Sequence, residues 1–360
     1  MQFGERLRMT IFGTSHGPEV GVVVEGLPAG TPVDLAAVQR QLDRRRPVGR
    51  RLATKRQEED RLVVDRGVVD GVADGTEFRA HVANEDVRRE PYDRLKDVPR
   101  PGHADFPARV RYGAEADLSG GGIFSGRMTV GLVIAGVLAE GLLARRGIGV
   151  AAFTRSIGAV DASVPDDLDL SSLRRLASQN EVESPDAAAA VRMEAAILEA
   201  RREGDSLGGV VEVRAVGLPV GLGEPFFDSV ESVVAHALFS IPAVKAVEFG
   251  AGFAAARMRG SQHNDPFVLE GERVRTSSNH AGGILGGLTN GMPLVARVAI
   301  KPTASIARPQ RSVDLVRRTE TTVTVTGRHD PCIVPRAVGV VEHVTAFALA
   351  DLGLRGGFLP

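Results

Sequence analysis

A stretch rich in proline and glycine in the first third of the chain carries side chains that could hold an anion and move a proton. Arg100, His103 and Asp105 stand among prolines that continue to Pro107, and we expect a rigid loop without helix because proline fixes φ and removes a backbone donor. Gly120–Gly122 follow at the start of a long apolar stretch, and bare N–H groups at a helix N-terminus favour anions. The alternative is that the glycines form only a tight turn and that Arg100 pairs with Asp105.

Two further segments near the N-terminus could take part in the same chemistry. His16 lies in a turn between small residues, where little would shield it from a ligand, although a lone histidine in a turn is more often structural. Basic residues crowd positions 44–56, directly after a helix that we expect over residues 35–43 with Asp34 as its cap. These cations either complement the helix dipole and stay solvated or line an anionic site, and the acidic residues 58–60 could neutralise some of them.

The hydrophobic pattern indicates the elements that would position these segments. Apolar and polar residues alternate over 61–96, with Asp74-Gly75 as a hairpin signal. Further along we expect helices over 129–146, 184–203, 229–239 and 337–352 and strands over 150–153, 209–216 and 294–300. No linker or low-complexity segment interrupts the chain, so we expect residues 1–360 to form a single domain.

Two parts of the chain share one plan. An expected strand over 20–25 ends in Gly26-Leu-Pro-Ala-Gly30 before a helix, and the strand 209–216 ends in Gly217-Leu-Pro-Val-Gly221 before another helix. The match favours an internal duplication with pseudo-symmetric halves. Because the matched segment is short, a chance match remains the rival explanation.

Composition limits the class of protein. Hydrophobic residues make up 43% and charged residues 25% of the chain, which is typical of a globular protein, and the net charge of −1 gives no general attraction for nucleic acid or an acidic membrane. Two tyrosines and no tryptophan also argue against RNA binding. The single Cys332 excludes an intrachain disulfide and favours a reducing compartment. We therefore expect a cytoplasmic protein whose partner is a small molecule.

Two other classes of site find no support in the residue spacing. The apolar run over 130–144 is short for a membrane span and contains Glu140. None of the spacings typical of zinc ligands occurs among the eight histidines, so we expect no metal site.

Six motifs follow one another along nearly the whole chain. They are Gly13-Thr-Ser-His-Gly17, Arg100-Pro-Gly-His-Ala-Asp105, Ser125-Gly-Arg127, Ser278-Asn-His-Ala-Gly-Gly283, Lys301-Pro-Thr303 and Gly327-Arg-His-Asp-Pro-Cys332. In order and spacing this set resembles the chorismate synthase family. Six ordered motifs are far more specific than any one of them.

The resemblance implies an α+β fold, a single-domain sandwich of helices between antiparallel sheets, that assembles as a homotetramer. It implies the 1,4-elimination of phosphate from 5-enolpyruvylshikimate 3-phosphate to give chorismate, the last common step of the shikimate pathway to the aromatic amino acids. The cofactor would be reduced FMN, which lends electron density to the substrate and receives it back. The protein would orient the cofactor and the substrate and neutralise their charge. Bifunctional members of the family also use NADPH to reduce the flavin.

The resemblance also implies roles for individual residues. His16 resembles the histidine that protonates the departing phosphate, His103 the histidine beside the flavin pyrimidine edge, and Asp330 the carboxylate that manages the flavin N5 proton. Five arginines look like the clamp for the substrate's carboxylates and phosphate: Arg45, Arg51, Arg100, Arg127 and Arg328. Flavin contacts would come from Ile123, Phe124, Ser125, Pro242, Ala243, Gly286, Lys301, Pro302, Thr303, Ala304, Ser305 and Arg328, and NADP contacts from Arg45 and Arg51.

Three positions depart from the family pattern. Ile123 and Met128 stand where many members carry arginine and an acidic residue, and Val48 stands where many carry glycine. Contact between the flavin and Ile123 would therefore involve the backbone alone. Because Val48 stands in place of glycine, the sequence leaves open the shape of the arginine-rich loop over residues 44–51.

The rival to an enzyme is a phosphate- or nucleotide-binding module without catalysis. Such a module would use the glycine loops alone and would leave His16, His103 and Asp330 without a role. Expelling phosphate needs an acid that titrates near neutral pH, which histidine supplies, and an anionic substrate beside an anionic flavin needs several fixed cations. The sequence therefore favours the enzyme.

Overall fold

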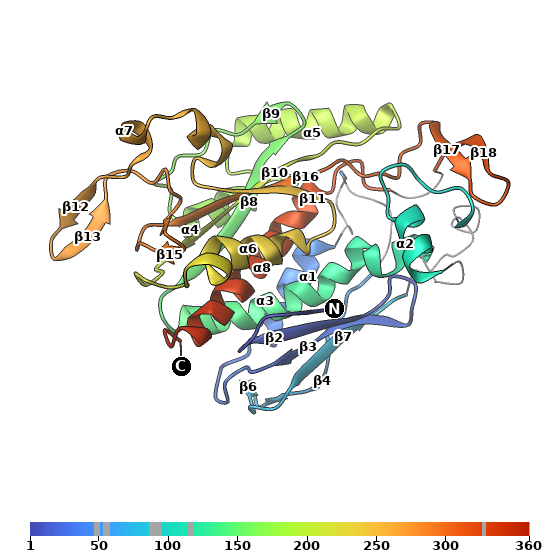
Figure 1. Ribbon diagram of the computed structural model, residues 1–360. Coiled ribbons are helices and arrows are strands. Elements are labelled where there is room, and N and C mark those ends of the chain that lie inside the picture. The colour runs from blue at the N-terminus through green and yellow to red at the C-terminus, as the bar shows by residue number, and fades with distance from the viewer. Residues whose placement is uncertain (47–50, 53–57, 86–95, 114–118, 326–328, 360) are drawn as a thin grey trace.

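The computed structural model describes residues 1–46, 51–52, 58–85, 96–113, 119–325 and 329–359, and within them two antiparallel sheets enclose a layer of helices (Figure 1). The first sheet has the strand order β1 (Gln2–Phe3), β2 (Arg8–Gly13), β3 (Glu19–Glu25), β7 (Phe78–Ala83) and β4 (Val63–Arg66). The second has the order β11 (Val244–Phe249), β16 (Leu294–Ile300), β10 (Gly209–Val216), β8 (Gly149–Ile157) and β9 (Val160–Asp161). This arrangement confirms the predicted α+β sandwich.

The helix layer contains α1 (Leu35–Arg45), α3 (Thr129–Ala144), α6 (Val230–Phe239) and α8 (Val334–Arg355). Helices α3 and α8 pack along each other, and Gly136 permits their close approach, since a Cβ there would lie 2.2 Å from Cβ of His343. The α8 helix and an apolar stretch that extends α3 are long enough to cross a membrane by length and composition alone, but they are mostly buried here, which accounts for that composition. One hydrophobic cluster joins buried side chains of both sheets to those of the helices.

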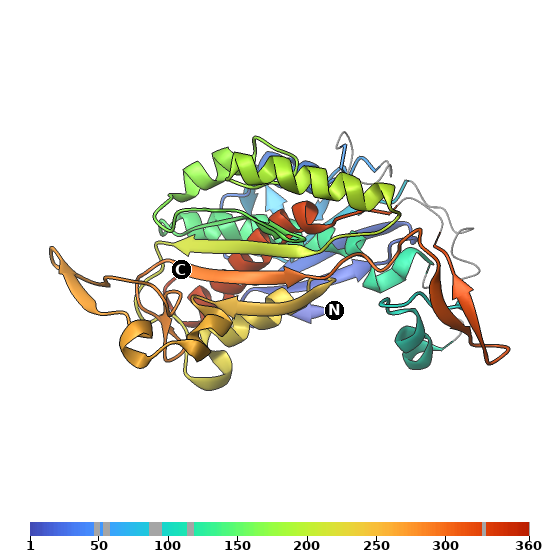
Figure 2. The ribbon, with the colours of Figure 1, turned by 90° about the horizontal axis from the view of Figure 1, so that it is seen from above.

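The other elements lie around this sandwich. Helix α5 (Ala187–Arg202) runs beside β8 and β9 on the outside of the second sheet (Figure 2). The remaining helices and turns of helix are α2 (Asp105–Tyr112), α4 (Leu170–Ala177), α7 (Gly260–His263), η2 (Ser119–Phe124), η3 (Gly126–Met128), η4 (Phe226–Asp228) and η5 (Gly252–Arg257). Four small two-stranded sheets are β5 (Val68–Val69) with β6 (Val72–Ala73), β12 (Phe267–Glu270) with β13 (Arg273–Thr276), β14 (Ile284–Leu285) with β15 (Leu288–Thr289), and β17 (Gln310–Asp314) with β18 (Thr319–Val323).

Capping residues explain where two of the central helices begin. The Asp34 side chain accepts a hydrogen bond from Ala37 N at 2.8 Å, as predicted for the start of α1. The hydroxyl of Ser229 accepts one from Ser232 N at 3.1 Å at the start of α6. Both caps satisfy backbone donors that a helix leaves unpaired in its first turn.

The two Gly-Leu-Pro turns adopt the same local conformation. Each follows the central strand of its sheet, β3 or β10, and Gly26 and Gly217 both have φ of +79°. A Cβ would lie 1.8 Å from Arg6 O at Gly26 and 2.3 Å from Gly147 O at Gly217, so only glycine fits. This agreement supports the predicted duplication.

Some sequence predictions were wrong in detail. Pro107 does not exclude helix, because it lies in the first turn of α2, where the missing N–H has no partner within the helix. Helix α5 begins after Asp186, whose side chain accepts from Ala189 N at 3.0 Å, and not at the predicted Ser184. Helix α4 lies in a segment for which the sequence analysis predicted no helix, and its cap is Asp169.

Candidate active site

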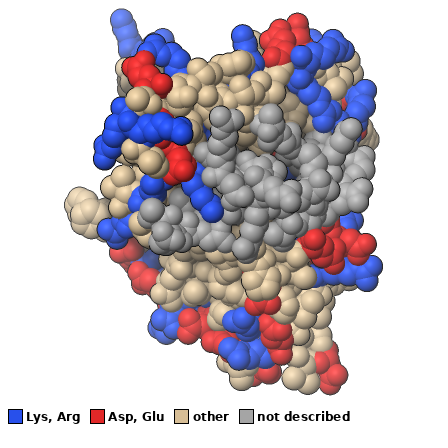
Figure 3. Space-filling view, turned by 90° about the vertical axis from the view of Figure 1, so that its right-hand side faces the viewer, with Lys and Arg blue, Asp and Glu red and all other residues tan. Residues whose placement is uncertain are grey.

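A cavity of about 720 Å³ lies where α1 and α6 end and where the segments leading into α3 and α8 begin. Most of the predicted site residues line it: Arg45, Arg100, His103, Ile123, Phe124, Ser125, Arg127, Pro242, Ala243, Lys301, Pro302, Thr303, Ala304, Ser305 and Asp330. The first turns of two long helices add partial positive charge at this end of the helix layer. On the face of the molecule shown in Figure 3, described Lys and Arg residues are interspersed with Asp and Glu.

The proline-rich loop forms one wall of the cavity through a three-residue network. Arg100 donates from Nε to Asp105 Oδ2 and from Nη2 to Asp105 Oδ1, both at 2.7 Å, and its Nη1 donates to Ser305 Oγ at 3.0 Å. His103 Nδ1 lies 2.6 Å from Asp105 Oδ1. Burial opposes the charge on Asp105, but hydrogen bonds from Arg100 and His103 outweigh it and hold the Asp105 pKa well below its usual range. Arg100 thus forms the predicted pair with Asp105 and also lines the cavity, so the pairing does not remove it from the candidate site.

The triple-glycine loop separates the two histidines. Gly120, Gly121 and Gly122 have φ of +60°, +94° and +52°, which is the left-handed region that favours glycine. A Cβ on Gly120 would lie 1.9 Å from His16 Cε1, so the imidazole packs directly on this residue. His16 is buried, and its Nδ1 lies 3.1 Å from Ser15 Oγ. His16 itself does not line the cavity, but Gly120, on which its ring packs, does.

A single buried carboxylate holds two of the predicted substrate-binding arginines. Asp60 Oδ2 accepts from Arg45 Nη2 at 2.6 Å, and Asp60 Oδ1 accepts from Arg127 Nη1. Burial lowers the pKa of Arg45 to about 10; repulsion from Arg336 and Arg127 adds to this, while Asp60 opposes it. Asp60 has a left-handed φ of +46°, a conformation that costs energy in a residue other than glycine. Glu58, whose Oε2 lies 3.7 Å from Arg127 Nη2, also lines the cavity, so the two arginines are held between two carboxylates.

Asp330 and Arg336 face each other on the wall formed by the start of α8. Arg336 Nη1 donates to Asp330 Oδ2, and both residues line the cavity. On the opposite wall, Lys301 Nζ donates to Gly102 O at 2.9 Å, and burial together with nearby Lys245 lowers the Lys301 pKa. Among the described residues, Thr303 Oγ1 and Arg45 Nε are buried without a hydrogen-bond partner. These two atoms remain available for a polar ligand.

Some predicted residues are not brought to the cavity. Arg51 pairs with Glu194 of α5 at 2.8 Å, and its side chain is 61% exposed. Gly286 lies in the turn between β14 and β15, near the opposite end of the molecule from α2 (Figure 1). Arg328 and Val48 lie outside the described residues. Of the positions that depart from the family pattern, Ile123 lines the cavity, whereas Met128 is buried in the hydrophobic core.

Asp60 and Arg336 are two residues of the site whose contacts the sequence did not reveal. Asp60 belongs to the acidic segment expected to neutralise nearby arginines, but nothing in the sequence showed that it bridges Arg45 to Arg127. Arg336 follows Pro335 in the first turn of α8. The sequence around it indicates the start of a helix but not a contact with the site.

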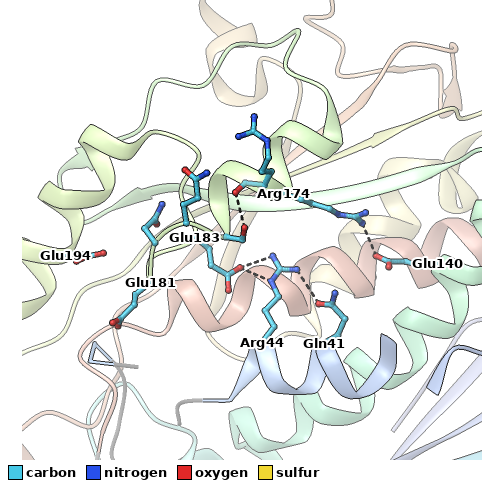
Figure 4. Close-up of a pocket in the computed structure, with 11 residues that line it drawn as sticks. Gln41, Arg44, Glu140, Arg174, Glu181, Glu183 and Glu194 are labelled. Carbon is cyan, nitrogen blue, oxygen red and sulfur yellow. Dashed lines mark hydrogen bonds and ion pairs between the residues drawn. The ribbon is translucent and has the colours of Figure 1, made fainter. Parts of the chain in front are cut away.

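A second, more polar cavity of about 910 Å³ lies behind the end of α1 (Figure 4). Arg44 donates from Nε to Glu183 Oε2 at 2.9 Å and from Nη1 to Glu342 Oε2 at 3.2 Å, and Arg174 Nη2 donates to Glu342 Oε1 at 3.0 Å. The charged groups of this cavity thus largely neutralise one another, and none of the predicted site residues lines it. In the described parts of the chain, no three of the His, Cys, Asp and Glu side chains gather as metal ligands would.

The fold and the first cavity define a class: an α+β sandwich protein with an arginine-rich pocket for a small polyanion. The family model for chorismate synthase matches residues 7–354. Chorismate synthases of Dehalococcoides mccartyi and Korarchaeum cryptofilum are 47% and 49% identical to the chain, and the matches cover 99% and 98% of the chain and 97% of each relative. A crystal structure of chorismate synthase superimposes with a TM-score of 0.78 at 29% identity and covers 98% of the chain and 93% of that structure.

The chain belongs to the chorismate synthase family. Its activity is that of the family, the elimination of phosphate from 5-enolpyruvylshikimate 3-phosphate to give chorismate, and its enzyme class is that of the carbon–oxygen lyases acting on phosphates.

Proposed function

We propose that the 720 Å³ cavity holds reduced FMN and the enolpyruvyl substrate together and that its side chains carry out the phosphate elimination. One observation carries this proposal: His103, three arginines and a carboxylate from distant parts of the sequence line one cavity, and His16 packs against Gly120 in the wall of that cavity. Convergence of titratable groups and fixed cations in a pocket is typical of an active site.

The cavity residues fit a flavin nucleotide. The volume lies within the range of small-molecule sites, and Lys301 and the unpartnered Thr303 hydroxyl supply a cation and a hydrogen-bonding group for polar parts of the cofactor. Phe124 and Ile123 offer apolar contact for a ring system, beside glycine backbone that lets it approach closely. When bound, the reduced flavin would supply the electron density that the breaking carbon–oxygen bond requires.

The arginines would hold the substrate. Arg45 and Arg127 are fixed by Asp60 before the substrate arrives, and Arg100 is fixed by Asp105. Because their guanidinium groups need no reorganisation, they can stabilise the negative charge that develops on the departing phosphate.

The histidines and Asp330 would manage protons. His16 would give a proton to an oxygen of the departing phosphate, and its contacts with Gly120 and with Ser15 Oγ hold the ring in place. His103 would be oriented beside the flavin by Asp105, and Asp330 would receive a proton at the carboxylate. A non-catalytic phosphate-binding module would need none of these three groups.

The role of NADPH is a separate part of the proposal. Arg45 lies at the cavity, whereas Arg51 lies against α5 through Glu194. A nicotinamide nucleotide that contacts both arginines would therefore have to extend beyond the cavity. We assign Arg51 to NADPH contact and leave it out of the substrate clamp.

The proposal includes a single cytoplasmic domain that forms a homotetramer. One hydrophobic cluster spans both sheets, which supports a single domain over residues 1–360. Phe226, Phe227 and Phe253 are each more than three-quarters exposed, as is Leu269 of the β12–β13 hairpin, and such exposure is typical of surfaces that pair with another subunit. Light scattering of the purified protein should give four times the chain mass; the mass of a monomer would contradict the assembly.

The direct test is an anaerobic assay. The protein is incubated with reduced FMN and 5-enolpyruvylshikimate 3-phosphate, and phosphate release and chorismate absorbance are followed together. We expect both products in equal amounts and none with oxidised FMN alone. A second arm with oxidised FMN and NADPH decides whether the protein reduces its own flavin. Binding of both ligands without release of phosphate would instead support a non-catalytic module.

A further inference from the structure

Arg336 stands between two groups of the proposed active site that come from different elements. Its Nη1 donates to Asp330 Oδ2, and its Nε donates to the backbone oxygen of Arg45 at 3.2 Å. The Arg336 side chain is 22% exposed and that of Asp330 is 10% exposed, so water screens their ion pair only partly. Arg336 is therefore the described side chain that joins the Asp330 segment to the last turn of α1.

The two partners differ in how firmly the fold holds them. Arg336 belongs to α8, whose residues from Val334 to Gly353 are almost all buried in the helix layer. Asp330 lies in an irregular segment ahead of that helix. A planar guanidinium that binds a carboxylate also fixes its direction, because its donors point along set lines. The rigid helix thus sets the direction of the less regular segment.

The surrounding charges explain why such a contact is needed. Arg45, Arg127 and Arg336 lie close enough that the last two lower the pKa of the first. Asp60 forms ion pairs with Arg45 and Arg127, and Asp330 forms one with Arg336. If Arg336 were absent, the Asp330 carboxylate would be drawn toward other cations of the pocket, away from the position that the proposed chemistry requires.

We propose that Arg336 is a positioning residue, which aims the Asp330 carboxylate into the cavity and ties it to the end of α1 that carries Arg45. This inference rests on the proposed function, in which Asp330 handles a proton. It differs from a direct role of Arg336 in substrate binding, because its effect on turnover should pass through Asp330.

A double-mutant cycle separates these roles. The variants are Arg336→Gln, Asp330→Asn and their combination, with Arg336→Lys as the conservative change. The control is Arg297→Gln in β16, because Arg297 is 28% exposed and donates from Nε to Glu212 Oε2 at 2.8 Å, but does not line the cavity. The readouts are kcat and KM in the anaerobic assay with reduced FMN, and the melting temperature of the cofactor-free protein.

We expect R336Q to lower kcat on the order of tenfold to a hundredfold, the scale of a small misplacement of a reacting group, and R336K to restore part of it. In the D330N background R336Q should change kcat less than about twofold. The melting temperature should show the same coupling. R336Q should lower it by about 1–3 °C in the wild-type background and by much less in the D330N background. R297Q should lower the melting temperature without lowering kcat.

The opposite results overturn the inference. Equal losses of kcat from R336Q in both backgrounds would mean that Arg336 acts independently of Asp330, and a rise in KM alone would make it a substrate-binding residue. Wild-type turnover in D330N would remove the role on which the positioning depends. Failure of the proposed function looks different, because the wild-type protein itself would then release no phosphate.

Discussion

His16 and His103 contact adjacent residues of one glycine loop. A Cβ on Gly120 would lie 1.9 Å from His16 Cε1, and a Cβ on Gly121 would lie 3.5 Å from His103 Nε2. The two histidines are separated by more than eighty residues of sequence, yet both lie beside this loop; His103 lines the cavity, and His16 packs behind Gly120. The loop therefore sets the spacing between the two histidines to which we assign proton transfer in the proposed function.

Replacing His16 should impair turnover more than cofactor binding. We expect H16A to lower kcat by about 10²–10⁴-fold, the usual contribution of a general acid, because the departing phosphate would leave without a proton. The dissociation constant of oxidised FMN, measured by fluorescence quenching, should change much less. The matched control is H81A, since His81 lies on β7 next to Asp65 and Glu19 and does not line the cavity. Unchanged turnover in H16A would show that another group is the acid.

A methyl group on Gly120 should reproduce part of that loss. G120A places a Cβ inside the contact with the His16 ring at a φ of +60°, so the ring must move. We expect kcat to fall on the order of tenfold or more. G71A is the control for backbone strain alone, because Gly71 has φ of +75° and a Cβ on it would meet no atom within 4 Å. If both variants lose stability but keep full activity, His16 does not depend on the loop.

The low pKa of Asp105 predicts a pH-dependent contribution to stability. A carboxyl group whose pKa is depressed by folding stabilises the protein above its unfolded pKa of about 3.9, and that stability is lost as the pH falls through the folded pKa. The free energy of unfolding of D105N should therefore be lower than that of the wild type at pH 7, and the gap should narrow below about pH 4. Urea unfolding at pH 7 and at about pH 2.5, where the carboxyl group is mostly protonated in the unfolded chain but still ionised in the folded protein, measures the gap. A gap that is the same at both pH values would contradict the ionic role of Asp105.

Cys332 should be inert in the native protein. Burial raises the pKa of this thiol to about 12, so roughly one thiol in ten thousand is ionised at pH 8. We expect an aromatic disulfide reagent to label it only after the chain unfolds in guanidinium chloride. Full labelling of the native protein within minutes would mean that the Cys332 segment opens readily.

The fold was predictable where local signals and tertiary packing agree. The caps Asp34 and Ser229 and the glycines Gly26 and Gly217 act on their own neighbours, so the sequence reveals them directly. The start of α5 was misplaced because the predicted start, Ser184, lies two residues before the actual cap, Asp186, and both residue types can cap a helix.

The site was predictable as a set of motifs but not as a set of contacts. The bridge from Asp60 to Arg127 spans 67 positions in sequence, and no local pattern encodes such a pairing. The same limit applies to Arg336, whose partners Asp330 and Arg45 come from two other segments. Long-range ion pairs depend on how the layers pack, which residue spacing alone does not specify.

The most direct test of a shared active site is a crystal structure of the protein with oxidised FMN and 5-enolpyruvylshikimate 3-phosphate, a pair that should not turn over. We expect both ligands in the 720 Å³ cavity, with the substrate phosphate near His16 and the arginines Arg45 and Arg127. Binding of the two ligands in the second cavity, near the end of α1, would contradict the shared active site. Binding on the outer surface, with both ligands far from His16 and Asp330, would contradict it as well.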